Sequence, residues 1–340
     1  MKKLLALVIL VTVVITGVHA GGGRQGAADP AGNNPVTILL ATGDAIGSMR
    51  NLMGERFRQE IERMPELNLT VNHVQGPVLG TASHILDQVV EGSVHIFGND
   101  ISWAAPYDND LLAMNFGFMF RDIDHMKAYF ASPVFTEVTD RIARANGIRI
   151  MMPVPTASRM FFSTTPIRQA SDFRGLMIRA PGLEMFIRSY EAYGASPTTV
   201  AWSEIFMALR TGVVDAAHGP ASDVIANQWH LAAPYITKTT DMFAANCWYV
   251  NEAFWQRLSP AQQEGVIRAM TITNQWVLEE SEAMEQRDIN TMVSEGATFL
   301  GYFPHAEREI LRNQAIEAVR RLEAGGAWSA GLVDAIQGIR

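Results

Sequence analysis

The segment that begins at Ser259 has the sequence pattern of one long helix. Ser259 is followed by Pro260 and Gln262, which form an N-terminal capping signature, and the helical pattern continues with no further proline, and no glycine except Gly265, to about Glu295. At 1.5 Å per residue such a helix is roughly 50 Å long. A lobe of about 100–150 residues is hardly longer than that. We therefore expect the helix to connect two lobes as a structural spine.

Upstream of this helix, β-branched segments alternate with helical patterns. Strands are expected at 36–41, 69–74, 94–97, 148–153, 160–163, 176–179, 213–217 and 247–251. Such alternation is typical of α/β folds with mainly parallel sheets and helices on both faces. About three hundred residues remain once the amino terminus is set aside, which suits two lobes better than one. Two lobes predict a ligand cleft between them.

The amino terminus predicts export. A basic start that includes Lys2 and Lys3 precedes an apolar run over residues 4–18, which is too short for a stable membrane span. We expect residues 1–20 to be a signal peptide, residues 21–35 to be a flexible tether and the mature protein to be periplasmic. No cysteine follows the apolar run, so a lipid anchor of the bacterial lipoprotein kind is not expected.

Charge and cysteine content exclude some classes of protein. The formal net charge is −8, and removal of Lys2 and Lys3 with the signal peptide leaves 25 basic and 35 acidic residues. An acidic chain argues against nucleic acid or an anionic membrane as the partner. The single cysteine, Cys247, permits no internal disulfide, and a small buried hydrophobe is favoured over a reactive thiol.

Two arginines stand at the boundaries of expected strands. Arg179 ends the strand at 176–179, and ligands of open α/β sheets bind at the carboxyl ends of strands. Arg159 lies just before the strand at 160–163, where we expect the chain to pass from one lobe to the other. A guanidinium group offers a planar, permanent charge to a carboxylate, although a single arginine is more often a solvated surface residue. If both face one cleft, the protein is a receptor for an organic acid.

The same region resembles a known family. The segments STTPI at 163–167, DFRGLMIR at 172–179 and EIFMALRTGVVD at 204–215 are similar to the core signature of the DctP-type solute-binding proteins of tripartite ATP-independent periplasmic (TRAP) transporters. Further similar segments are GPVLG at 76–80, FGFMFRD at 116–122 and VNEAFW at 250–255. The resemblance covers essentially the whole mature chain.

The resemblance implies a two-lobed periplasmic binding protein fold, α/β in class, whose lobes exchange chain more than once and share the long helix. Lobe I is expected at residues 36–156, with 245–284 returning to it. Lobe II is expected at residues 157–244, with 285–340 returning to it.

The resemblance also implies a binding site. Arg179 matches the principal carboxylate clamp of the family, and Arg159 matches a second arginine that assists it. Trp202 falls where members often place an aromatic side chain against the ligand. From the residues alone, Trp202 is equally consistent with an ordinary core position.

The chain departs from the family pattern at several positions. The motif that starts at Asp215 is DAAHGP where the family usually has DGQENP, so Gly219 replaces an asparagine that often contacts the ligand. His218 is a candidate replacement for that contact, although a lone histidine at a strand end is more often structural. Asp241 replaces a common histidine, and Gly117 a proline. Asp215, His218 and Asp241 are kept as candidate ligand-binding residues beside the arginines and Trp202.

The expected mechanism is capture of a solute, not catalysis, with no cofactor and no metal. We expect a monomer that closes around a small mono- or dicarboxylate, with a sugar acid or an aromatic acid as the next ligand classes, and delivers it to the membrane permease subunits of a TRAP transporter. One alternative is a sensor that presents the acid to a signalling receptor. The other is a secreted hydrolase, but the sequence has no GxSxG motif and no HExxH motif.

Overall fold

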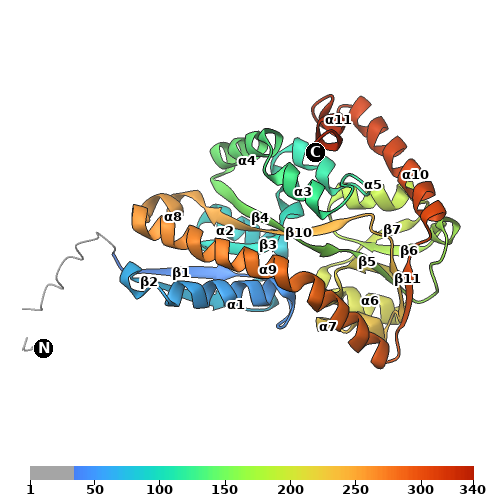
Figure 1. Ribbon diagram of the computed structural model, residues 1–340, viewed down its shortest axis with the longest axis horizontal. Helices are drawn as coiled ribbons and strands as arrows, with labels where there is room; N and C mark the ends of the chain where they lie inside the picture. The colour runs from blue at the N-terminus through green and yellow to red at the C-terminus, as the bar shows by residue number, and fades with distance from the viewer. Residues whose placement is uncertain (1–33) are drawn as a thin grey trace, which may run out of the picture.

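Two β-sheets, each covered by helices, organise residues 34–340, the part of the chain that the computed structural model describes (Figure 1). The expected signal peptide and all of the expected tether except Asn34 and Pro35 lie outside the described residues. Within residues 34–340, no helix combines the length and the apolar character that crossing a bilayer requires. The two sheets belong to two lobes, which we call lobe I and lobe II.

The sheet of lobe I has five strands in the order β2-β1-β3-β10-β4. β1 runs parallel to β2 and β3, whereas β10 runs antiparallel to β3 and β4. Its strands are β1 (Val36–Ala41), β2 (Leu69–Val74), β3 (Ile96–Asp100), β4 (Ile148–Ser158) and β10 (Phe243–Asn251).

The sheet of lobe II has six strands in the order β11-β9-β5-β8-β6-β7. β6 runs parallel to β7 and β8, and β11 runs parallel to β9, whereas β5 runs antiparallel to β8 and β9. Its strands are β5 (Met160–Ser163), β6 (Met177–Ala180), β7 (Ser196–Thr199), β8 (Ala216–Gly219), β9 (Tyr235–Lys238) and β11 (Thr298–Tyr302).

Each sheet contains both parallel and antiparallel strands because the chain crosses between the lobes in two neighbouring segments of opposite direction. β4 continues through Arg159 into β5, so the chain leaves lobe I for lobe II there, and it returns from β9 to β10. The two segments run side by side in opposite directions, because β10 pairs with β4 and β9 pairs with β5 in antiparallel register. Between them, the backbone N–H of Arg159 donates to the carbonyl of Met242 at 2.9 Å. The crossing is therefore a hydrogen-bonded ribbon.

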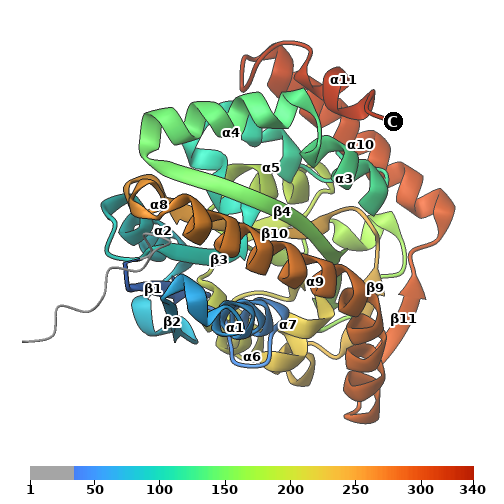
Figure 2. The same cartoon turned by 60° about the vertical axis from the view of Figure 1, so that its left-hand side comes forward.

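Helices surround the sheets in the described part of the chain (Figures 1 and 2). They are α1 (Met49–Glu62), α2 (Ala82–Glu91), α3 (Ile123–Phe130), α4 (Pro133–Asn146), α5 (Glu184–Ala192), α6 (Ile205–Thr211), α7 (Ala221–Ala226), α8 (Glu252–Arg257), α9 (Pro260–Ser294), α10 (His305–Ala324) and α11 (Leu332–Gln337). The carboxyl-terminal residues return to α3, since the carbonyl of Ile336 lies 2.8 Å from Nε2 of His125.

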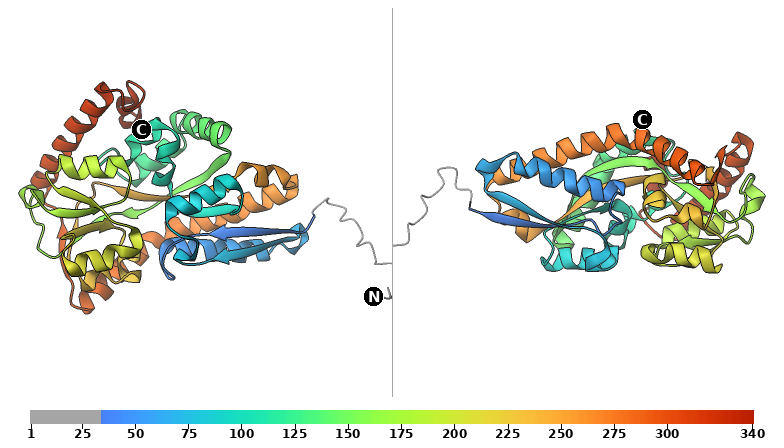
Figure 3. Two further views of the ribbon diagram at one scale, coloured as in Figure 1. Left: turned by 180° about the vertical axis from the view of Figure 1, so that it is seen from behind. Right: turned by 90° about the horizontal axis from the view of Figure 1, so that it is seen from below.

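The long helix α9 is present and spans both lobes, as expected (Figure 3). Ser259 and Gln262 form the capping box at its start, and the helix continues for 35 residues. Val266 and Met270 near its start belong to the core of lobe I, whereas Met292 near its end belongs to the core of lobe II. One helix thus contributes to two hydrophobic cores and ties the lobes together.

The one glycine inside α9 marks a close contact. A Cβ atom on Gly265 would lie 2.1 Å from Cδ1 of Leu67, in the short 3-10 turn Pro65–Leu67 that precedes β2. Glycine in a helix interior costs about 1 kcal/mol relative to alanine. The close packing of α9 on this turn accounts for its presence.

The predicted fold class is confirmed: the chain is an α/β protein with two lobes and a shared helix. The boundaries of the lobes at 36–156, 157–244, 245–284 and 285–340 remain a prediction.

Candidate functional site

A large cavity lies between the lobes. Its volume is about 790 Å³, and residues of both lobes line it. From lobe I it is lined by the segment after β1, by the end of β3 and by α2; from lobe II it is lined by the end of β6 and the segment after β7. Apart from α2, these segments lie at the carboxyl ends of strands, where ligands of α/β sheets bind.

Arg179, at the end of β6, is a buried cation that lines this cavity, with 4% of its surface exposed. Its Nε donates to the carbonyl of Val200 at 2.9 Å. Among residues 34–340, no carboxylate lies within ion-pair distance of its guanidinium group. Burial, and to a smaller extent the charge of Arg159, lower the pKa of Arg179 to about 9. The group still carries its charge at pH 7, without an anion of the described chain beside it.

Arg159, in contrast, already has an anionic partner. Its guanidinium lies 2.7 Å from the carboxylate of Asp100 at the end of β3 and 3.4 Å from the carbonyl of His218. It also lies 5.2 Å from the ring centroid of Phe186. Arg159 lines the cavity. The ion pair crosses from lobe II to lobe I, so Arg159 connects the lobes as well as facing the site.

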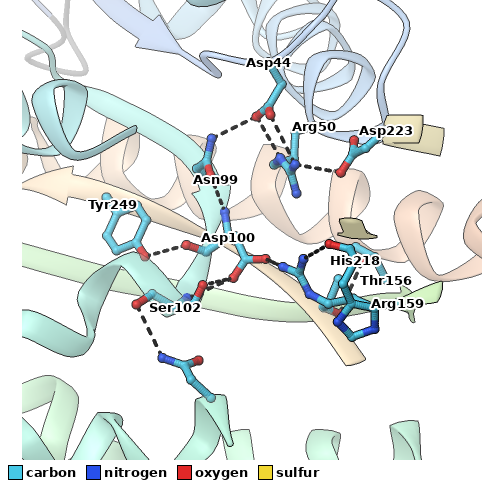
Figure 4. A network of polar contacts seen from close by, with 12 residues as sticks. Asp44, Arg50, Asn99, Asp100, Ser102, Thr156, Arg159, His218, Asp223 and Tyr249 are labelled. Carbon is cyan, nitrogen blue, oxygen red and sulfur yellow. Dashed lines mark hydrogen bonds and ion pairs between the residues drawn. The ribbon is translucent and has the colours of Figure 1, made fainter. Parts of the chain in front are cut away.

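A third arginine, Arg50 in the first turn of α1, lines the cavity as well. It bonds Asp44 of lobe I at 2.7 Å and Asp223 of α7 in lobe II at 2.7 Å (Figure 4). Asn99 donates to the same Asp44 carboxylate at 2.9 Å. Although burial opposes the charge, Asp223 and Asp44 raise the pKa of Arg50.

The cluster around Arg50 was not predicted from the sequence. The sequence did contain one indication of it. Ligands of α/β sheets bind near the carboxyl ends of strands, and Arg50 comes soon after the carboxyl end of β1, just as Arg179 lies at the end of β6.

Trp202 contacts the guanidinium groups from the side of lobe II. Its ring centroid lies 5.2 Å from the guanidinium carbon of Arg179 and 5.6 Å from that of Arg50. Trp229 packs edge-on against it with centroids 4.7 Å apart. Trp202 is partly buried and lines the cavity, so the structure places it beside Arg179, and its contact with a ligand remains a prediction.

A comparison of the sequence with known families adds a decisive observation. The family described as "Bacterial extracellular solute-binding protein, family 7" (DctP) matches residues 48–324 of the chain. The chain belongs to this family.

Individual relatives of the chain are distant in sequence. A solute-binding protein of Roseobacter denitrificans is 24% identical over 255 residues, which cover 74% of this chain and 77% of that protein. The sialic acid-binding periplasmic protein SiaP of Vibrio cholerae is 22% identical over 242 residues, which cover 70% and 74%.

Solved structures show the same fold. A TRAP periplasmic solute-binding protein from Pseudomonas putida F1 with bound D-glucuronate matches with a TM-score of 0.81 and 21% identity, over 90% of this chain and 98% of that one. One from Shewanella oneidensis with bound succinate matches with a TM-score of 0.83 and 18% identity, over 90% and 99%. The fold agrees with the family match, which confirms the resemblance seen in the sequence.

His218 and Asp241 form a buried pair outside the large cavity of this DctP-family protein. Nε2 of His218 lies 3.5 Å from Asp241, and Nδ1 lies 3.2 Å from the hydroxyl of Tyr190. Burial lowers the pKa of His218. Burial opposes ionisation of Asp241, but His218 and the hydroxyls of Thr239 and Tyr193 lower its pKa. The pair lies behind Arg159, whose guanidinium bonds the His218 carbonyl.

Asp215 lies at the opposite end of the lobe II sheet from the cavity. Its carboxylate accepts a hydrogen bond from the backbone N–H of Met177 at 3.2 Å, where β6 begins. Arg179 stands near the other end of the same strand. The structure brings Arg179, Arg159 and Trp202 together, and leaves Asp215 apart from them.

The structure gives a reason for Gly117. Its backbone N–H donates to the hydroxyl of Ser189 at 3.0 Å, a bond that a proline cannot make. A Cβ atom there would lie 1.9 Å from the hydroxyl oxygen of Tyr193. That hydroxyl donates to Asp241 at 2.9 Å. Two departures from the family pattern, Gly117 and Asp241, are thus linked through one tyrosine.

Residues 34–340 contain no group of three or more histidine, cysteine, aspartate or glutamate side chains arranged to hold a metal ion. His84 and Asp87 both line the cavity, but they are two exposed side chains of α2 and do not belong to a group of three potential metal ligands.

Proposed function

We propose that this DctP-family protein captures a small organic acid between its lobes, with Arg179 as the carboxylate clamp. The observation that carries the proposal is the state of Arg179: a buried guanidinium that lines the interlobe cavity without a carboxylate of the described chain beside it. An isolated buried charge is costly, and a bound carboxylate relieves that cost through charge-assisted hydrogen bonds.

Arg159 has a different role in this proposal. Its Asp100 partner at 2.7 Å already balances its charge, so it supports the site and connects the lobes, with a weaker direct attraction for the ligand. When the lobes close, water leaves the cavity and the attraction between Arg179 and the ligand carboxylate strengthens in the lower dielectric. Closure follows because the closed form binds the acid better than the open form does.

The comparisons support an acid as ligand and a transporter as destination. Proteins of the same fold have been solved with D-glucuronate, succinate and galactonate, all of which carry a carboxylate. We infer that the protein is exported to the periplasm and delivers its ligand to the permease of a TRAP transporter. It acts by binding and has no catalytic step.

Matched pairs of acids and amides test this function. The mature protein is heated with succinate, D-glucuronate or benzoate, and in parallel with the amide of each acid. We expect at least one acid to raise the melting temperature in a concentration-dependent way, while its amide does not. If no acid raises it more than its amide does, the proposed function is wrong.

A further inference from the structure

The charged side chains on the inner wall of the cavity, apart from Arg179, already pair with one another. Both oxygens of Asp44 accept hydrogen bonds from Arg50, and one of them also accepts from Asn99. One oxygen of Asp100 accepts from Ser102, and the other accepts from Arg159. All of these side chains are buried. A ligand hydroxyl at this wall has to compete with charged, buried hydrogen bonds, and gains little from doing so.

A second ligand carboxylate also finds no free cation deep in the cavity. Arg50 lies between Asp44 and Asp223, and Arg159 is paired with Asp100 (Figure 4). Another anion placed there meets three aspartates along with the two arginines. Among the arginines that line the cavity, Arg179 alone lacks a carboxylate partner in the described part of the chain. The site therefore favours a single carboxylate.

The absence of a side chain at residue 219 shapes the wall beside Arg179. A Cβ atom on Gly219 would lie 3.1 Å from the ring of Trp229 and 3.5 Å from the ring of Trp202. An asparagine there needs the space that the two indole rings occupy. Gly219 thus lets Trp229, buried in the core, support Trp202 edge-on at 4.7 Å. The asparagine of the family pattern is thus replaced by space for the Trp202–Trp229 pair.

Other surfaces of the cavity are apolar as well. Trp103 and Tyr107 contribute from the 3-10 segment Ile101–Tyr107 of lobe I, and Leu183 and Phe186 contribute from lobe II. Some polar side chains of the lining make no hydrogen bond within the described chain: His84, Asp87, Thr199 and Ser203 are exposed, and Nε1 of Trp202 is buried without a partner. A volume of about 790 Å³ lies in the range of pockets that enclose ligands larger than a four-carbon acid.

We propose that the ligand is a monocarboxylate with an apolar, planar body, an aromatic acid, and that Gly219, Trp229 and Trp202 form the unit that selects it. This inference rests on the proposed function, because it takes Arg179 as the carboxylate site. Aromatic side chains favour a planar apolar partner through burial and ring contacts. Trp202 contacts the ligand, and Trp229 positions Trp202.

Titration calorimetry on the mature protein tests the ligand class. The panel is benzoate, phenylacetate, cinnamate, succinate and D-glucuronate, with benzamide as the control for the carboxylate. We expect the best aromatic acid to bind at least tenfold more tightly than succinate and D-glucuronate, and more tightly than benzamide. If succinate or D-glucuronate binds as tightly as the best aromatic acid, the aromatic inference is wrong while the acid-binding function stands. If no acid binds, both are wrong.

Two variants test the selecting unit. Gly219→Asn should weaken the best aromatic acid at least tenfold, and Trp202→Leu provides the same test should the asparagine variant not fold. Trp276→Leu on α9 is the matched control, since this partly buried tryptophan packs against the lobe I core and does not line the cavity. We expect the control to bind like the wild type. Equal affinity of the Trp202→Leu protein and the wild type for the aromatic acid overturns the assignment of Trp202.

Discussion

Arg50 of lobe I and Asp223 of lobe II form an ion pair of 2.7 Å across the boundary between the lobes. Only 1% of the Asp223 surface is exposed. Burial raises the pKa of this carboxyl group to about 6, although Arg50 opposes the shift and Asp44 adds to it. The link between the lobes is therefore coupled to pH.

The sign of this coupling gives a first prediction. Between about pH 4 and pH 6, folded Asp223 holds a proton that the unfolded chain releases, so its contribution to the free energy of unfolding falls as the pH rises through this window. Asp223→Asn removes the titration. We expect the difference in free energy of unfolding, wild type minus variant, to fall by up to about 3 kcal/mol across the window.

Denaturant unfolding at a series of pH values measures this difference. Asp288, whose pKa burial raises to about 6, titrates in the same window but is unchanged in both proteins and cancels. A difference that stays constant from pH 4 to pH 7 contradicts the assignment.

The paired and unpaired arginines should respond to the same substitution in opposite ways. Arg159→Met leaves Asp100 buried without its cation, so we expect the free energy of unfolding to fall by about 3–5 kcal/mol. Arg179→Met removes a buried charge that lacks a carboxylate, so we expect the free energy of unfolding of the ligand-free protein to stay equal or rise by about 1 kcal/mol. Chemical denaturation without ligand compares them. A loss above about 2 kcal/mol in Arg179→Met would show that its charge is balanced within the protein.

The contact between Gly117 and Tyr193 predicts a strong coupling. A methyl group on Gly117 overlaps the tyrosine hydroxyl, so Gly117→Ala should lower the free energy of unfolding by about 1–3 kcal/mol. Tyr193→Phe removes the hydroxyl and its bond to Asp241, and is itself destabilising. The double variant should be more stable than the sum of the two losses predicts, because the overlap is gone. Additive losses in a double-mutant cycle argue against the contact.

Gly265 offers an independent test of the packing of α9. Alanine is favoured over glycine in a helix by about 1 kcal/mol, but its Cβ atom meets Leu67. We expect Gly265→Ala to lower the melting temperature of the wild type. In a Leu67→Ala background, where the clash is absent, we expect the same substitution to raise the melting temperature. If Gly265→Ala stabilises the wild type, Leu67 moves aside freely and the contact has no energetic role.

Much of the fold is readable from periodicity. The bounds of β1, β2 and β5 and the start of α9 agree with the pattern of apolar residues and caps. β3 was expected at 94–97 but spans Ile96–Asp100, because the polar Asn99 and Asp100 still pair with β10. The short strands β7 and β11 at the edges of their sheet were missed, as was β9. β7 contains Pro197 and β11 contains Gly301, and both residue types weaken the strand signal of a sequence.

The site was readable only in part. Arg179 and Arg159 lie at strand boundaries that the nearby proline and glycine residues indicate in the sequence. The partners of Arg50 and Arg159 were not predicted, since Arg50 and Asp223 are 173 residues apart and Arg159 and Asp100 are 59 apart. Such pairs follow from how the lobes meet, which no local pattern records. The same holds for Gly219, whose neighbours are two tryptophans from other segments.

Titration calorimetry with Arg179→Met tests the central claim most directly. The best-binding acid is titrated into the wild type, into Arg179→Met and into Arg188→Met, which removes an exposed arginine of α5 paired with Glu184 and Glu191. Arg179→Met should lose at least a hundredfold in affinity, about 3 kcal/mol, while Arg188→Met binds like the wild type. If Arg179→Met, folded and stable, binds the acid as tightly as the wild type does, Arg179 is not the carboxylate clamp.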